Sequence, residues 1–297
     1  MTYSMVARDP ATGDLGVAVQ SHWFSVGSVV TWARPGVGAV ATQSFAEPAY
    51  GPNLLDRLAA GDGTAAALAA EVAADEGERL RQVGAVSATG EVAAHTGASC
   101  VPFAGDVQGD GWSAQANMMA SEGVWPAMAE AFDAADRPLA RRLMAALEAA
   151  EAAGGDVRGR QSAAILVVPA AGEPWRRTID LRVDDHPEPL DELARLLRLH
   201  EAYTLVNEAE ELGAAGRHEE AGEMGRRALE MEPDNPEFLF WGGLSLAHQG
   251  QRDLGLELVR RAIAINPAWR DLLGRLSQEI APSAAEIRAA LTIDASS

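Results

Sequence analysis

The chain has no lysine, because all 24 of its basic residues are arginine. Mechanisms that need a lysine amine are therefore excluded, namely the phosphate-binding P-loop, Schiff-base catalysis and serine–lysine dyads. Cysteine is nearly as scarce: Cys100 is the only one. Neither an intrachain disulfide nor a metal site with several thiolate ligands can form from a single cysteine.

The six histidines are scattered, and no pair has the i, i+4 spacing with acidic support that marks a helical zinc motif. Paired carboxylates suited to glycoside hydrolysis are also missing, since Asp9 and Asp14 belong to a turn and Asp184 and Asp185 to a linker. We therefore expect no metal site and no cofactor.

Long apolar runs are absent as well, and none approaches the roughly 20 residues needed to span a bilayer. The first residues show neither the charged leader nor the apolar core of a secretion signal. The formal net charge of −19 argues against nucleic acids and anionic membranes, which both attract basic surfaces. We expect a cytoplasmic protein without nucleic-acid or membrane partners.

What is present in the first two thirds of the chain is a succession of short β-branched and small-residue segments interrupted by helical stretches. Strand and helix runs are segregated, which favours α+β layers over alternating βαβ units, and two sheets faced by helix pairs fit the order. Thr64 is the expected N-cap of one helix. The predicted strands are 4–9, 15–20, 26–34, 37–43, 82–87, 91–96, 112–118, 163–168 and 178–183; the predicted helices are 53–60, 64–76, 124–135 and 138–153.

A polar, proline-containing segment at residues 184–189 separates this region from a helical tail. We place the domains at 1–187 and 188–297. The tail contains an internal repeat, because Gly216, Ala221, Ala228 and Pro233 recur 34 positions later as Gly250, Gly255, Ala262 and Pro267. The period and the small residues resemble tetratricopeptide repeats. Such repeats bind a peptide or protein partner, or they only dimerise the protein or pack on the first domain.

The start of the chain is the first candidate for chemistry. If Met1 is removed, Thr2 carries a hydroxyl beside a free α-amine, which is one way to activate a weak nucleophile. The alternative is that Thr2 is simply the first residue of a strand.

Residues 2 to about 199 resemble the bacterial family called domain of unknown function 1028. The matching stretches are TYSMVARD (2–9), GVGAVATQ (36–43), RQVG (81–84), TGASC (96–100), GDG (109–111), GRQSAA (159–164) and LRVDDHP (181–187). The resemblance implies an N-terminal-nucleophile-hydrolase-like αββα sandwich, with Thr2 attacking an amide carbonyl. It does not imply a substrate.

Several polar residues are expected around Thr2. Ser21 and His22 end the second strand, and histidine as a residue type is suited to proton transfer near neutral pH. Asn117 is a candidate oxyanion donor. Candidate substrate-binding residues, each of which could instead make only structural hydrogen bonds, are Gln43, Ser44, Glu47, Tyr50, Gln115, Arg160 and Gln161. A buried Arg160 would hold a carboxylate.

Cys100 is an alternative nucleophile, with His95 close in sequence as the group that would lower the thiol pKa. A lone cysteine is more often a small buried hydrophobic residue.

The leading functional hypothesis is hydrolysis of a small amide or related C–N bond by Thr2. The alternative is a non-catalytic scaffold that recruits a partner through the repeats. The absence of lysine favours the scaffold, since proteasome-type members of the superfamily use a lysine beside their threonine.

Overall fold

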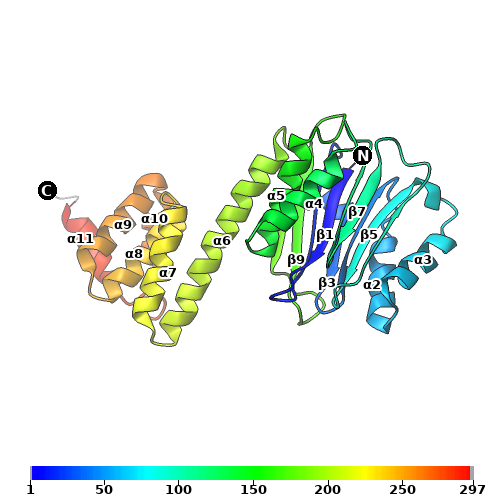
Figure 1. Ribbon diagram of the computed structural model, residues 1–297. Coiled ribbons are helices and arrows are strands. Elements are labelled where there is room, and N and C mark those ends of the chain that lie inside the picture. Colours follow the sequence, from blue (N-terminus) through cyan, green and yellow to red (C-terminus); the bar gives the residue numbers. More distant parts are fainter. Residues whose placement is uncertain (1, 295–297) are drawn as a thin grey trace. The chain divides into compact units, whose positions relative to one another are not determined.

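Two β-sheets with their covering helices occupy the first part of the chain, and helices alone occupy the rest (Figure 1). The computed structural model describes residues 2–294. The chain divides into two compact units between Leu196 and Leu197. The prediction of a mixed α and β region followed by a helical region is confirmed at this level.

The larger sheet has six strands in the order β10-β9-β2-β1-β8-β7, with every neighbouring pair antiparallel. Its strands are β1 (Thr2–Arg8), β2 (Leu15–Ser21), β7 (Gly105–Gly109), β8 (Trp112–Asn117), β9 (Ser162–Val168) and β10 (Ile179–Val183). The turn between β1 and β2 is held by the Asp9 carboxylate, which accepts hydrogen bonds from the backbone N–H groups of Ala11 and Thr12.

The smaller sheet has four antiparallel strands in the order β3-β4-β5-β6. They are β3 (Thr31–Arg34), β4 (Gly38–Ser44), β5 (Arg81–Ser87) and β6 (Val92–Thr96). Buried valines and alanines of both sheets form one core cluster, including Val6, Val19, Ala41 and Val86, so the sheets pack face to face.

Helix pairs cover the outer faces of both sheets (Figure 1). Helices α4 (Val124–Ala134) and α5 (Leu139–Ala152) pack on the six-stranded sheet, and α2 (Tyr50–Ala60) and α3 (Thr64–Ala74) pack on the four-stranded sheet. A 3₁₀ turn, Glu78–Leu80, leads into β5. The order of layers is therefore helices, sheet, sheet, helices.

The prediction of one strand over residues 26–34 is wrong in its first half, where the chain forms the single-turn helix α1 (Gly27–Val30). A Cβ at Gly27 would lie 2.5 Å from the Cβ of Ala164, so α1 can approach β9 only with glycine here. The Thr31 hydroxyl donates to the Gly27 carbonyl, 2.7 Å away, and closes the turn. Contacts distant in sequence thus override the β propensity of the valines.

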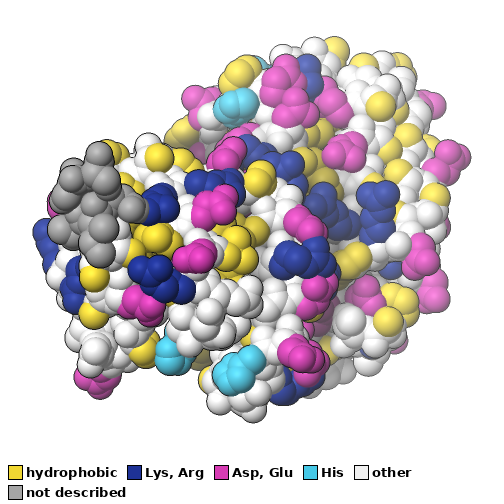
Figure 2. All heavy atoms as spheres, turned by 90° about the vertical axis from the view of Figure 1, so that its left-hand side faces the viewer, with side chains coloured by type: hydrophobic (Ala, Val, Ile, Leu, Met, Phe, Trp, Pro, Cys, Tyr) yellow, Lys and Arg dark blue, Asp and Glu magenta, His cyan; other side chains and the backbone are white. Residues whose placement is uncertain are grey.

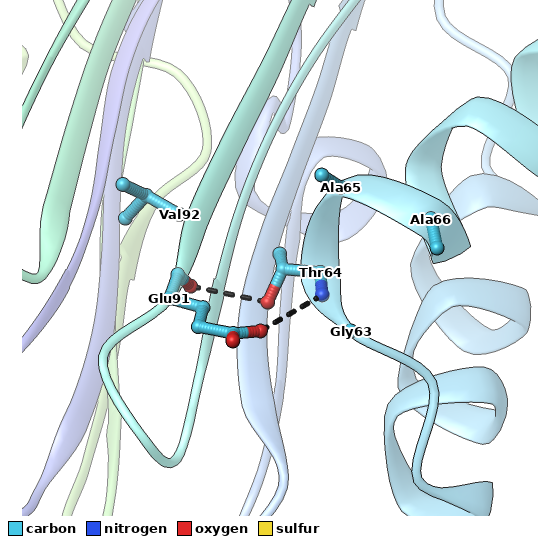
Figure 3. Close-up of a pocket in the computed structure, with 6 residues that line it drawn as sticks. All are labelled: Gly63, Thr64, Ala65, Ala66, Glu91 and Val92. Atoms are coloured by element: carbon cyan, nitrogen blue, oxygen red, sulfur yellow. Dashed lines mark hydrogen bonds between the residues drawn. The ribbon is translucent and has the colours of Figure 1, made fainter.

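The prediction that Thr64 caps a helix is also wrong. The N-cap of α3 is Gly63, and the first backbone N–H is satisfied by the Glu91 carboxylate, 3.2 Å from the Thr64 nitrogen (Figure 3). A carboxylate suits this position because the helix N-terminus carries partial positive charge. In the pocket shown in Figure 3, the charged side chain, Glu91, is therefore already hydrogen-bonded to the helix N-terminus.

The second unit is helical. Its elements are the end of α6 (Pro189–Ala214), then α7 (His218–Met231), α8 (Pro236–His248), α9 (Arg252–Ile265), α10 (Ala268–Arg275) and α11 (Ala284–Asp294). Helix α9 begins and ends 34 residues after α7. Gly216 and Gly250, which precede these helices, both have positive φ, at 77° and 87°.

Figure 2 shows arginine and carboxylate side chains interspersed over one face of the molecule. Many form pairs three residues apart, such as Arg195 with Glu192 and Arg226 with Glu223. Exposed pairs of this kind contribute about 0–1 kcal/mol each, so the helical unit depends on its apolar core for stability.

Candidate functional site

Thr2 lies at the end of the space between the two sheets. It is the first residue of β1, and it pairs with Ser21 of β2 on one side and with Asn117 of β8 on the other. Its side chain is 4% exposed, and its hydroxyl donates to the Ser21 hydroxyl at 3.0 Å. The topology thus brings together three of the predicted catalytic residues, which are far apart in sequence.

The carbonyl of Thr2 is held by two side-chain amides from different sheets. Gln43 of β4 donates to it at 3.2 Å, and Asn117 donates at 3.3 Å. The same two donors also reach the side-chain oxygen of Gln82 in β5, at 2.8 Å and 3.0 Å. These contacts fix the backbone of Thr2 from both sheets.

Deeper between the sheets the polar contacts continue. Ser4 donates to Gln43 at 2.6 Å and accepts from Gln115 at 2.7 Å. Gly84 makes room for the Gln115 side chain, which a Cβ at this position would overlap. We call Ser4, Gln43, Gln82, Gln115 and Asn117 the amide network. All five are buried and hydrogen-bonded, as groups removed from water must be.

Gln82 and Ser4 were not predicted as site residues. Gln82 joins the two halves of the network, since its own amide nitrogen also donates to the Ala116 carbonyl at 2.9 Å and to the Thr96 hydroxyl at 3.0 Å. A glutamine next to the start of an otherwise apolar strand was the available signal. It became informative only once the opposite sheet was placed.

Replacing Gln82 with leucine is expected to destabilise the first unit by about 2–4 kcal/mol, because Gln43 and Asn117 would each lose an acceptor at buried positions. Urea unfolding should show this loss. Gln108→Leu, on an exposed position of β7, is the matched control and should change the free energy of unfolding little. Equal stabilities of the two variants would contradict the structural role of the network.

A second polar cluster lies on the helix-covered side of the same sheet. The hydroxyl of Tyr3 donates to Glu151 of α5 at 2.8 Å. Burial and the Glu151 carboxylate hold the pKa of Tyr3 well above its usual value. Arg160 pairs with the same carboxylate and with Glu188. Arg160 is thus already paired with carboxylates. It is also exposed, whereas the sequence predicted a buried arginine.

His22 and Gln161 lie next to this cluster. The backbone N–H of His22 donates to the buried carboxylate of Asp156 at 3.1 Å, and its ring Nδ1 lies 3.2 Å from the Arg160 carbonyl. The Gln161 side chain donates to Asp185 at 3.1 Å. These residues frame the end of β2 instead of contacting the Thr2 hydroxyl.

The predicted site residues that end or follow β4 occupy different surroundings. Ser44 ends the strand with φ of 72°, an uncommon conformation for serine, and Glu47 accepts a hydrogen bond from the Ala49 backbone. Tyr50 packs in the core between α2, α3 and the sheet, and donates to Asp75 at 3.2 Å. Burial and Asp75 raise its pKa. The structure therefore places Tyr50 away from Thr2.

Cys100 is half-buried, and its thiol donates to the Arg81 carbonyl at 3.3 Å. His95 contacts Glu78, with its ring Nε2 2.9 Å from the carbonyl and 3.3 Å from the carboxylate. The guanidinium of Arg81 bonds Asp75 at 2.8 Å and holds the pKa of that carboxyl below its usual value. The Cys100 thiol thus has a carbonyl neighbour, and the His95 ring has a different partner, Glu78.

Within residues 2–294, no three histidine, cysteine, aspartate or glutamate side chains gather as a metal ion would require. Over the same residues no helix combines the length and apolar character needed to cross a bilayer.

A family model described as "Family of unknown function (DUF1028)" matches residues 2–193. The chain belongs to this family. The crystal structure of a DUF1028 protein, SPO2555 from Silicibacter pomeroyi, is similar with a TM-score of 0.62 and 35% sequence identity, over 66% of this chain and 84% of that one. No curated protein matches significantly. The part of the chain that matches DUF1028 contains Thr2, Ser21 and the whole amide network, whereas α7 to α11 lie beyond it.

Proposed function

We propose that this DUF1028 protein hydrolyses a small amide or related C–N bond, with Thr2 as the nucleophile in an N-terminal-nucleophile-hydrolase-like sandwich. The observation that carries the proposal is the position of the Thr2 hydroxyl, which is bonded to Ser21 at the end of the inter-sheet space while the Thr2 backbone is clamped by Gln43 and Asn117. A nucleophile held by supporting hydrogen bonds is pre-organised for attack.

The chemistry requires that Thr2 carry a free α-amine, and Met1 lies outside the described residues. The Thr2 oxygen would attack the amide carbon while its proton passes to the α-amine, directly or through water. The resulting ammonium would protonate the leaving nitrogen, so that the C–N bond breaks and an ester to Thr2 remains. Water would then cleave the ester, giving a carboxylic acid and restoring the threonine hydroxyl.

In this proposal Ser21 orients the Thr2 hydroxyl as its hydrogen-bond acceptor. Asn117, which already donates to the Thr2 carbonyl and to Gln82, acts as a positioning residue instead of an oxyanion donor. Positioning of this kind matters because small misplacements of a nucleophile cost large factors in rate.

A β-lactone probe tests the nucleophile without knowledge of the substrate, because a reactive hydroxyl opens the ring and keeps the acyl group. Intact mass is expected to show a chain lacking Met1 and carrying one adduct, and peptide mapping should place the adduct on Thr2. Thr2→Ala should remain unlabelled, and Thr12→Ala, in the exposed β1–β2 turn, should be labelled normally. Adducts on Thr2→Ala, or on protein that retains Met1, would overturn the mechanism.

A partner-recruiting role for the helical unit is the second candidate. It is supported by the 34-residue offset between α7 and α9 and by the matching positive φ of Gly216 and Gly250, which fit a tetratricopeptide-like architecture. The occupant would be a peptide, a protein or a second copy of this chain. A scaffold role alone predicts that the β-lactone probe leaves the protein unmodified.

A further inference from the structure

Exposed large apolar side chains are concentrated around Thr2. In the first unit's described residues seven such side chains are exposed, and all except Trp175 lie on connections at the Thr2 end of the sheets. We call these six the apolar rim: Trp23, Phe24, Phe45, Leu80, Phe103 and Val157. Five of them are 43–64% exposed. Exposed apolar side chains that gather at one end of a fold are candidates for a binding surface.

Backbone hydrogen bonds connect four members of the rim in two separate pairs. The Phe45 N–H donates to the Leu80 carbonyl at 3.3 Å. The Phe103 carbonyl accepts from Met119, and the Val157 N–H donates to Met118, at 3.1 Å and 3.4 Å.

The remaining members, Trp23 and Phe24, lie two and three residues after Ser21. The Trp23 carbonyl accepts a hydrogen bond from the Ser162 hydroxyl at 2.5 Å. Ser21 pairs with Thr2 and Gln43 donates to the Thr2 carbonyl, so Trp23, Phe24 and Phe45 each lie two or three residues beyond a neighbour of the proposed nucleophile.

Three arginines on the same connections are paired with carboxylates, whereas Arg79, beside Leu80, donates to the Ser99 hydroxyl at 3.4 Å. Arg81 bonds Asp75, Arg158 bonds Asp156, and Arg160 bonds two carboxylates. Breaking these pairs to bind an anion would leave a carboxylate without its partner. The six rim side chains therefore offer mainly apolar contact, and small-molecule sites are lined mainly by such side chains.

We propose that the apolar rim binds a bulky apolar group beside the scissile bond, so that the substrate class is a neutral amide with an alkyl or aromatic substituent. This rests on the proposed function for the identity of the bond that is cleaved. The rim itself supplies the affinity, and it disfavours substrates that carry a carboxylate in the same place.

The test separates binding from catalysis by titrating Thr2→Ala protein calorimetrically. The probes are acetyl, hexanoyl, adipoyl and phenylacetyl 4-nitroanilide, and a matched amine series of N-methyl-, N-hexyl- and N-(5-carboxypentyl)acetamide. We expect the hexyl or hexanoyl compound to bind at least tenfold more tightly than its short and its carboxylated counterparts in at least one series. Trp23→Ala and Phe45→Ala should each weaken this binding several-fold, whereas Trp175→Ala, an exposed aromatic outside the rim, should not.

Equal affinities within both series, or tighter binding of the carboxylated members, would overturn the proposal. So would rim variants that change the oligomeric state in light scattering while ligand affinity stays constant, because a second copy would then be the occupant. If the predicted preference is found but wild-type protein cleaves no member of either series, the hydrolase proposal fails and the apolar binding site stands. If wild-type protein cleaves amides but shows no preference for the apolar members, the hydrolase proposal stands and the apolar binding site fails.

Discussion

Thr2→Ala is expected to lower kcat for amide hydrolysis by about 10³-fold or more, because the attacking oxygen is lost and the neighbouring Ser21 hydroxyl has no α-amine of its own to accept its proton. The measurement is release of 4-nitroaniline from whichever anilide the wild-type protein cleaves. The fold should persist, since alanine fits the β1 position and removes one hydrogen bond, the donation to Ser21. Unchanged melting behaviour would exclude unfolding as the cause.

Thr2→Ser is the matched control for this prediction. It keeps both the hydroxyl and the α-amine, so measurable hydrolysis should remain. An inactive serine variant with normal stability would indicate that the threonine methyl group is needed to orient the oxygen. Full activity of Thr2→Ala would instead refute the nucleophile and direct attention to Cys100.

Gly243→Ala in α8 is expected to destabilise the helical unit by about 1–3 kcal/mol, through overpacking. A Cβ at Gly243 would lie 2.7 Å from the Gly255 carbonyl oxygen and 2.9 Å from a methyl group of Val259. Backbone lies on the other side of this contact, so α8 and α9 would have to move apart. Urea unfolding and hydrogen exchange of the α8 and α9 amides would measure the loss.

The preceding residue supplies the control, because a Cβ at Gly242 would meet nothing within 4 Å. Gly242→Ala should stabilise α8 by about 0.5–1 kcal/mol, since alanine loses less backbone entropy than glycine in a helix. Adjacent glycine-to-alanine changes should thus have opposite signs. Two effects of the same sign would show that α8 and α9 do not pack through Gly243.

Local signals were sufficient for many of the elements. The hairpin of β1 and β2 follows from two apolar runs separated by Asp9 and Gly13, whose conformations are set by near neighbours. The corresponding helices α7 and α9 follow from glycines and alanines that recur at a fixed period. The hairpin is determined by residues within one turn, and the two helices by a repeat that is readable directly in the sequence.

Predictions failed where distant segments decide the outcome. The first turn of residues 26–34 is helical because Gly27 packs against Ala164, which no local pattern reveals. Tyr50 follows the strand that carries Gln43, but it turns into the α2 interface and bonds Asp75. Gln82 was overlooked because strand alternation shows which face a residue occupies, and not which polar groups meet it from the opposite sheet.

If the proposed mechanism holds, the burial of Thr2 between β2 and β8 has a consequence for when Met1 can be removed. An aminopeptidase must bind the first residues as an extended, unpaired chain, yet Thr2 and Tyr3 are paired on both sides in the folded sheet. Strand β8 emerges from the ribosome roughly 100 residues after β1, which leaves about 5–20 s at ordinary rates of synthesis. Removal of Met1 would therefore compete with folding, and chains that close the sheet first would remain unprocessed zymogens.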